Sequence, residues 1–182
     1  MSGIPRFTGG GSSKETKLPK RPELSNPNIV SELPTRKVIN VIASIKDIDP
    51  LARVTKKFQV AGVPTLSFEV SEYIAGIEWT GDFSIKKQRQ AFQTYLHEFM
   101  HMALWDDTTI SHSPDETSIL YYYVKGDVIE PNPWDLKVIK ESANRIGNIL
   151  IDSSQLKDNT WIQFTSKTWN SYVGREFYKT NI

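Results

Sequence analysis

The spacing of hydrophobic residues changes several times along the chain, and each change predicts a different element. The run at 38–43 is rich in β-branched residues and predicts a buried strand. Residues 65–70 alternate between apolar and polar side chains, which predicts a half-buried strand, and a further short strand is expected over 73–80. Between the first two strands, an aspartate followed by a proline resembles a helix start and predicts a helix over 49–59.

From Ser84 onward the spacing becomes helical. Apolar side chains recur every three or four residues and predict one buried helix face, formed by Phe92, Tyr95, Leu96, Phe99, Met102 and Ala103. Residues 108–123 predict loop and extended chain. A second long helix is expected to start at Asn132 with Pro133 and Asp135 and to end near Gly147, with a buried face of Leu136, Val138, Ile139 and Ile146.

These elements predict one α+β domain over residues 37–150, flanked by two appendages. Residues 1–36 hold five of the ten prolines and four of the ten glycines. This composition indicates either a tail that is disordered on its own or an arm that lies along a neighbouring subunit. Residues 151–182 are aromatic and polar and predict a hairpin or an ordered C-terminal extension, which is a second candidate contact with neighbouring subunits.

Composition disfavours several classes of protein. A formal net charge of +1 argues against a nucleic-acid binder held mainly by phosphates. The absence of cysteine leaves His, Asp and Glu as the ligands for any transition-metal site. The apolar runs are shorter than the roughly 18–20 residues that span a bilayer, and the first residues lack a secretory signal. We therefore expect no membrane partner, and a location in the cytoplasm or in a viral particle.

The candidate chemistry lies in one short region, because all three histidines fall between positions 97 and 112. His97-Glu98-Phe99-Met100-His101 is the H-E-x-x-H pattern on the predicted helix. Histidines four residues apart leave the same helix face and can share one metal ion. Glu98 is rotated away by one residue, so it can miss the metal and still take a proton from a metal-activated water. The plainer alternative is a pair of ordinary surface histidines.

A catalytic zinc site needs three protein ligands and one open position. His112 is the natural third ligand, and three imidazoles with an open position make Zn²⁺ the expected metal. Three carboxylates compete with it for that place. They are Asp115, Glu116 and, on the second predicted helix, Glu141.

Two segments resemble the matrixins, a family within the metzincin clan of zinc endopeptidases. The segment 97–104 resembles their active-site helix, and 112–121 resembles the family's next segment, where a third His precedes Ser, the Met of the Met-turn and Tyr. Leu120 stands at the Met position and Tyr121 at the Tyr. The resemblance implies a small twisted sheet, an active-site helix and a second C-terminal helix. It also implies Zn²⁺ bound by the three histidines, with Glu98 as general base.

The chain departs from the matrixin pattern in its loop and in its turn. Leu104 replaces the Gly that ends the family's active-site helix, and the interval between His101 and His112 is longer than the family's. We therefore expect the helix to continue through Trp105 and 106–111 to form a longer return loop. Leu120 replaces a Met that serves as a packing floor rather than a ligand, so Leu should be tolerated. The matrixin cysteine switch has no counterpart, because cysteine is absent.

The resemblance implies a zinc-dependent endopeptidase that binds a peptide or protein substrate as an extended strand, with 73–80 as the expected sheet edge. In serralysin- and astacin-like metzincins a Tyr at the offset of Tyr122 stabilises the oxyanion; the alternative for Tyr122 is an ordinary core or surface aromatic residue. The rival function is a structural or assembly subunit of a larger particle, such as a phage virion, that retains the fold. The intact Glu98 favours catalysis, because a structural site needs no base.

Overall fold

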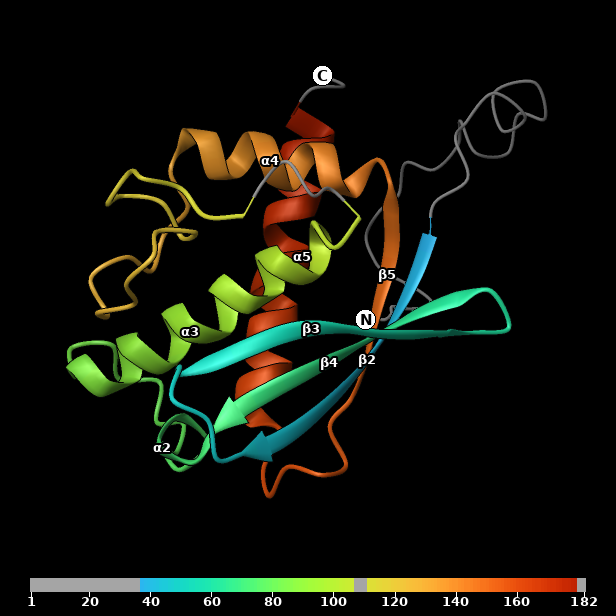
Figure 1. The fold of residues 1–182 in the computed structure, drawn as a ribbon. Coiled ribbons are helices and arrows are strands. Elements are labelled where there is room, and N and C mark those ends of the chain that lie inside the picture. Colours follow the sequence, from blue (N-terminus) through green and yellow to red (C-terminus); the bar gives the residue numbers. More distant parts are fainter. Residues whose placement is uncertain (1–36, 107–110, 180–182) are drawn as a thin grey trace. The chain divides into compact units, whose positions relative to one another are not determined.

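The computed structural model describes residues 37–106 and 111–179, so the predicted arm at 1–36 lies outside the described residues. The described part has an α+β fold with a four-stranded mixed open sheet (Figure 1). None of its helices is long and apolar enough to cross a membrane. The elements in chain order are β2 (Lys37–Lys46), β3 (Ala52–Val60), β4 (Val63–Ser71), α2 (Glu72–Ala75), α3 (Lys86–Ala103), α4 (Pro133–Ala143), β5 (Ile146–Asp152) and α5 (Thr160–Lys179).

The sheet has the strand order β3-β4-β2-β5, which makes β3 an edge strand. Strands β2 and β4 are parallel, with Val41 opposite Leu66, and β3 pairs with β4 in antiparallel fashion. The hairpin between β3 and β4 turns at Ala61 and Gly62, whose φ angles of 52° and 81° suit the twist of a tight hairpin. The helix predicted over 49–59 is therefore wrong, because pairing with β4 outweighs the local Asp-Pro signal.

The strand predicted over 73–80 is also wrong. The chain forms the short helix α2 there, and the Ser71 side chain caps it by accepting a hydrogen bond from Ile74 N–H at 3.2 Å. At its end, the Gly76 N–H donates to the Glu72 carbonyl at 3.0 Å. This segment consequently offers no strand edge to a substrate.

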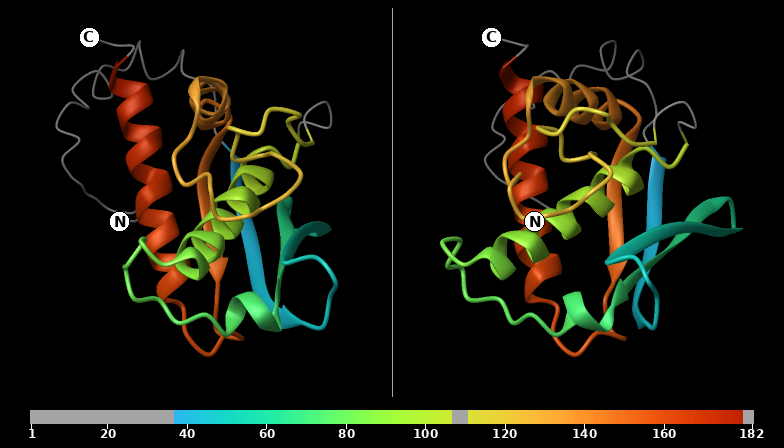
Figure 2. Two further views of the ribbon diagram at one scale, coloured as in Figure 1. Left: turned by 90° about the vertical axis from the view of Figure 1, so that its left-hand side faces the viewer. Right: turned by 60° about the vertical axis from the view of Figure 1, so that its left-hand side comes forward.

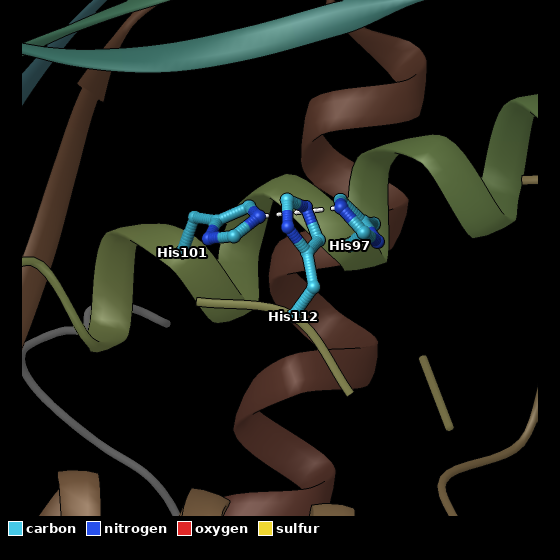
Figure 3. A group of neighbouring side chains, drawn as sticks. All are labelled: His97, His101 and His112. Carbon is cyan, nitrogen blue, oxygen red and sulfur yellow. Dashed lines mark hydrogen bonds between the residues drawn. The ribbon is translucent and has the colours of Figure 1, made fainter. Parts of the chain in front are cut away.

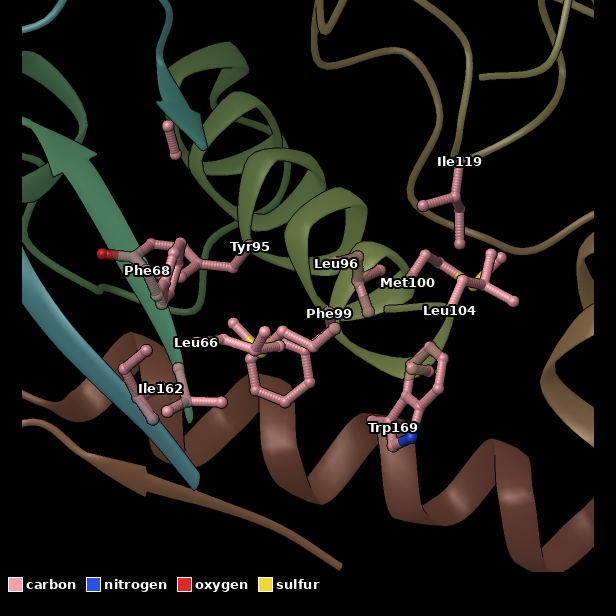
Figure 4. Packing of buried hydrophobic residues seen from close by; sticks show 14 of the residues in the cluster. Leu66, Phe68, Tyr95, Leu96, Phe99, Met100, Leu104, Ile119, Ile162 and Trp169 are labelled. Carbon is pink, nitrogen blue, oxygen red and sulfur yellow. The ribbon is translucent and has the colours of Figure 1, made fainter. Parts of the chain in front are cut away.

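Helix α3 lies at the centre of the packing and carries the H-E-x-x-H pattern. It packs against β3, β5, α4 and α5, and every residue from Ala91 to Met100 is buried. Figure 2 shows α3 lying over the sheet with α5 running next to it. Figure 4 shows part of this core, where Leu66 of β4 lies near Phe99, Phe68 of β4 lies near Tyr95, and Trp169 packs from α5. The predicted helix is thus confirmed, but residues 91–100 are buried on all sides rather than on one face, because the core surrounds this part of α3.

The C-terminal segment forms a helix rather than a hairpin. The Trp161 indole of α5 stacks on Tyr95 of α3 at 5.8 Å between ring centroids, and its Nε1–H donates to the Ile77 carbonyl at 2.7 Å. Farther along α5, Trp169 lies 6.3 Å from Phe99. Helix α5 therefore contributes directly to the core beneath the H-E-x-x-H pattern.

The helix predicted from Asn132 is confirmed at its start and shorter at its end. A capping box joins Asn132 and Asp135, each side chain accepting from the other residue's backbone N–H. The helix ends at Ala143 instead of near Gly147, because the residues from Ile146 onward join the sheet as β5. Ile146 is buried as predicted, as a strand residue.

Candidate metal centre

Three imidazoles converge on the outer face of α3. His97 and His101 leave the same side of the helix, and their Nε2 atoms lie 3.2 Å apart. The His112 ring comes from the segment after α3 and lies 5.3 Å from the His97 ring and 5.0 Å from the His101 ring, measured between centroids (Figure 3). The ligand nitrogens of the three residues all lie within 4.8 Å of one another, so this group could hold a metal ion.

The donor set and most of its geometry fit zinc. Tetrahedral Zn²⁺ with bonds of about 2.0–2.1 Å to nitrogen places its ligand atoms roughly 3.3 Å apart. The 3.2 Å between the Nε2 atoms of His97 and His101 matches this separation. Separations within the group reach at most 4.8 Å, so zinc would draw the third ligand, His112, inward by no more than about 1.5 Å. His112 is exposed while His97 is buried, so the side chain that would have to move is the one with space to do so.

The tautomer of His97 is fixed by one backbone carbonyl. Its Nδ1 lies 2.7 Å from the Ile119 carbonyl oxygen, which can only accept a hydrogen bond. The proton of neutral His97 therefore resides on Nδ1, and the lone pair of Nε2 is directed toward His101. A backbone carbonyl bound to the far nitrogen is the usual support of a metal-ligating histidine.

Burial keeps the two helical histidines neutral. Desolvation lowers the pKa of His97 to about 4, an effect that the hydrogen bond to Ile119 opposes and the nearby His112 reinforces. Desolvation, with smaller contributions from His97 and His112, lowers the pKa of His101 to about 3. Burial lowers the pKa of His112 as well. Since only neutral imidazole binds a metal ion, both helical histidines could bind one at neutral pH without losing a proton.

Glu98 is a buried carboxyl with an unsatisfied oxygen. Its side chain is 5% exposed, and its Oε1 has no hydrogen-bond partner among the described residues. Burial raises the pKa of Glu98 to about 8. A carboxylate in this position lowers stability, which is typical of groups retained for chemistry. A nearby cation would favour the ionised form that a general base requires.

In the metal-free protein, Glu98→Gln is expected to raise stability at pH 9 and to change it little at pH 4.5. The folded state holds the Glu98 proton up to about pH 8, above the ordinary value of 4.5, so wild-type stability falls as pH rises through this window. At pH 9 the free energy of unfolding of Glu98→Gln should exceed that of the wild type by an amount on the order of a few kcal/mol. Urea unfolding with a chelator present measures it, and an equal difference at both pH values would contradict the buried, protonated Glu98.

The other candidates from the sequence lie outside this group. Tyr122 is 58% exposed, and its ring lies 5.2 Å from that of His112, so it borders the site. Among the described residues, the carboxylates of Asp115, Glu116 and Glu141 do not join the three histidines. The Asp115 carboxylate instead accepts hydrogen bonds from the N–H and hydroxyl of Thr117 at 2.9 and 2.8 Å.

The end of α3 differs from the expected course. The helix ends at Ala103 and does not continue through Trp105, since Leu104 already has the non-helical angles φ −107° and ψ 14°. Contacts outside the helix hold the next residues: the Lys56 ammonium lies 5.4 Å from the Trp105 ring centroid, and Asp106 accepts from Arg145 at 3.2 Å. Part of the predicted return loop, residues 107–110, lies outside the described residues.

The segment after His112 is closed by its own backbone. The Ser113 N–H donates to the Leu120 carbonyl at 2.9 Å, and Ser113 forms a parallel bridge with Tyr121. Leu120 and Ile119 are completely buried. This closure places the Ile119 carbonyl and His112 on the same side of α3, where both reach His97.

Sequence reasoning missed the buried carboxylate that holds this segment. The sequence identifies Asp135 only as part of a helix start, yet its oxygens also accept from the Ser118 hydroxyl at 2.7 Å and the Ile119 N–H at 2.9 Å. The available signal is local and indicates only the capping box. The contact to residues 118 and 119 depends on the fold and has no signature in the sequence.

Comparison with protein-family models, with curated proteins and with solved structures gave no match. The functional argument for this chain accordingly rests on three observations at one place: the convergence of His97, His101 and His112, the fixed tautomer of His97, and the buried carboxyl of Glu98.

Proposed function

We propose that the chain is a zinc-dependent endopeptidase with a metzincin-like catalytic domain. The observation that carries the proposal is the group of three converging imidazoles, two of them on a helix that also holds a buried carboxyl with an unsatisfied oxygen. His97, His101 and His112 would hold the metal, and Glu98 would act as the general base. A purely structural site would gain nothing from Glu98, whose burial lowers stability.

When bound, zinc would supply a polarised carbonyl and a water of lowered pKa. The residues of the chain do the rest. Glu98 would accept a proton from the water that attacks the peptide carbonyl and would then deliver this proton to the leaving amine. Both tasks suit an acid with a pKa near the working pH. Tyr122 borders His112 and is exposed, so its hydroxyl is the candidate donor to the developing oxyanion.

The peptide substrate would bind at β3 rather than at 73–80. Strand β3 is the antiparallel edge of the sheet, and it packs against α3, the helix that carries the site. An extended peptide can add to such an edge through backbone hydrogen bonds. An edge strand beside an active-site helix also supports the metzincin-like interpretation of the fold.

The test is hydrolysis of an unfolded protein, such as reduced and alkylated casein, by zinc-loaded protein. We expect new peptide amino termini to appear, to cease with a chelator and to return when zinc is restored. Cleavage that ignores the chelator would indicate a contaminating protease of another class. No cleavage by protein that carries stoichiometric zinc would contradict the proposal.

An assembly role is the second candidate. The observation that favours it is apolar exposure on an edge strand: Leu150 of β5 is 53% exposed, and β5 ends the sheet opposite β3. Under this alternative the protein would join other subunits of a particle through that edge, and replacing Glu98 would leave assembly and function unchanged.

A further inference from the structure

Among the described residues, Asp135 is the most completely buried carboxylate, and it does not belong to the group of His97, His101 and His112. It is 0% exposed, although it belongs to the first turn of α4. One oxygen accepts from the Ser118 hydroxyl at 2.7 Å. The other accepts from the backbone N–H groups of Ile119 at 2.9 Å and Asn132 at 3.0 Å. Both oxygens are therefore engaged, and two of the three donors come from the segment after His112.

Helix capping accounts for only part of this arrangement. The capping box of α4 needs the bond from the Asn132 N–H to Asp135 and the return bond from the Asp135 N–H to the Asn132 side chain at 2.8 Å. It needs neither Ser118 nor Ile119, and it does not require burial of the carboxylate. The two additional bonds join α4 to the segment that carries the support of His97.

A continuous chain of hydrogen bonds leads from Asp135 to His97. The Ser118 hydroxyl donates to Asp135, and its oxygen in turn accepts from the Leu120 N–H at 3.0 Å. That N–H belongs to the same peptide group as the Ile119 carbonyl. This carbonyl accepts the Nδ1–H of His97 at 2.7 Å. The bonds all point the same way, so each polarises the next and strengthens the carbonyl as an acceptor.

We propose that Asp135 is a positioning residue of the metal centre, acting through Ser118 and the Ile119–Leu120 peptide group to keep the His97 proton on Nδ1 and Nε2 directed at the metal. The inference rests on the proposed metal site. Many metal-ligating histidines bind a carboxylate directly through their far nitrogen. Here the negative charge would act on His97 through a serine and one peptide group.

The expected effect follows from the loss of this support. Asp135→Asn keeps the shape of the side chain but replaces one acceptor oxygen with a donor, so it cannot accept all three bonds. Ser118→Ala removes only the hydroxyl that links Asp135 to the peptide group. Loss of such outer partners weakens metal affinity about 10–100-fold. We expect an increase of this size in the zinc dissociation constant for both variants, measured by competition with a chromophoric chelator.

The decisive readout is the tautomer of His97 in metal-free protein, followed by ¹⁵N NMR of the imidazole nitrogens. The wild type should show the proton on Nδ1, and both variants should show a mixture of tautomers. Ser142→Ala is the matched control, because it removes another buried hydroxyl of α4, one bonded to the Ile139 carbonyl at 3.0 Å. This control should keep the wild-type tautomer and zinc affinity.

Two results would overturn the inference. One is a wild-type tautomer and an unchanged zinc affinity in Ser118→Ala, which decides the matter even where Asp135→Asn does not fold. The other is an equal loss of affinity in Ser142→Ala, which would reduce Asp135 to a stabiliser of α4. Because the tautomer is measured without metal, a protein that binds zinc but hydrolyses nothing would contradict the proposed function and leave this inference standing.

Discussion

Glu98→Gln is expected to abolish peptide hydrolysis while zinc stays bound. The amide has the size of the carboxyl but cannot accept a proton, and loss of general-base catalysis alone lowers rates about 10²–10⁴-fold. Glu98 is buried on helix α3, which packs within the core, and its Oε1 has no hydrogen-bond partner among the described residues. The substitution therefore breaks no contact of that atom, and the fold should persist.

The measurement is the rate of casein cleavage at matched zinc content, with circular dichroism to verify the fold. Glu141→Gln is the control, because Glu141 is an exposed carboxylate of α4 that does not join the histidine group. Its activity should equal that of the wild type. Equal activity of Glu98→Gln and wild type would contradict the assignment of Glu98 as base, and loss of zinc together with activity would make Glu98 a ligand.

Trp161→Ala should cost about 3–5 kcal/mol in the free energy of unfolding, as is usual for truncating a large buried aromatic side chain. Trp161 is 4% exposed, stacks on Tyr95 of α3 and donates to the Ile77 carbonyl. The substitution leaves a cavity between α5 and α3 and an unpaired acceptor at Ile77. Because α3 carries two of the three proposed metal ligands, His97 and His101, we also expect weaker zinc binding.

Urea unfolding monitored by far-UV circular dichroism measures this prediction. Trp134→Ala provides the comparison, because Trp134 is 39% exposed on α4 and should contribute less than about 1 kcal/mol. A loss of similar size in the two variants would mean that α5 does not form part of the core that supports α3.

The elements predicted correctly are those whose signals are local. Helix α3 has apolar residues at helical spacing within its own sequence, and the start of α4 carries its own capping box. The pairing of His97 and His101 also follows from helical spacing alone. Each of these features depends on residues within a few positions of one another, so the sequence suffices to predict it.

The features that the sequence predicts wrongly or leaves open depend on partners that are distant in the sequence. Strand β3 exists because β4 pairs with it, which no residue of 49–59 reveals. For residues 151–182 the composition predicts either a hairpin or an ordered extension, and α5 fits only the second; its Trp161, Trp169 and Tyr172 recur at spacings that suit one helix face. The hydrogen bonds from His97 to the Ile119 carbonyl and from the Ile119 N–H to Asp135 join three separate segments, so only the fold shows them.

The most direct test of the metal centre is elemental mass spectrometry of purified protein, with wild type and His112→Ala compared after equal exposure to zinc. We predict about one zinc per wild-type chain and a lost or much weaker site in the variant, since three ligands are needed for a catalytic site. Wild-type protein without zinc, or a variant that holds it as tightly, would contradict the three-histidine centre.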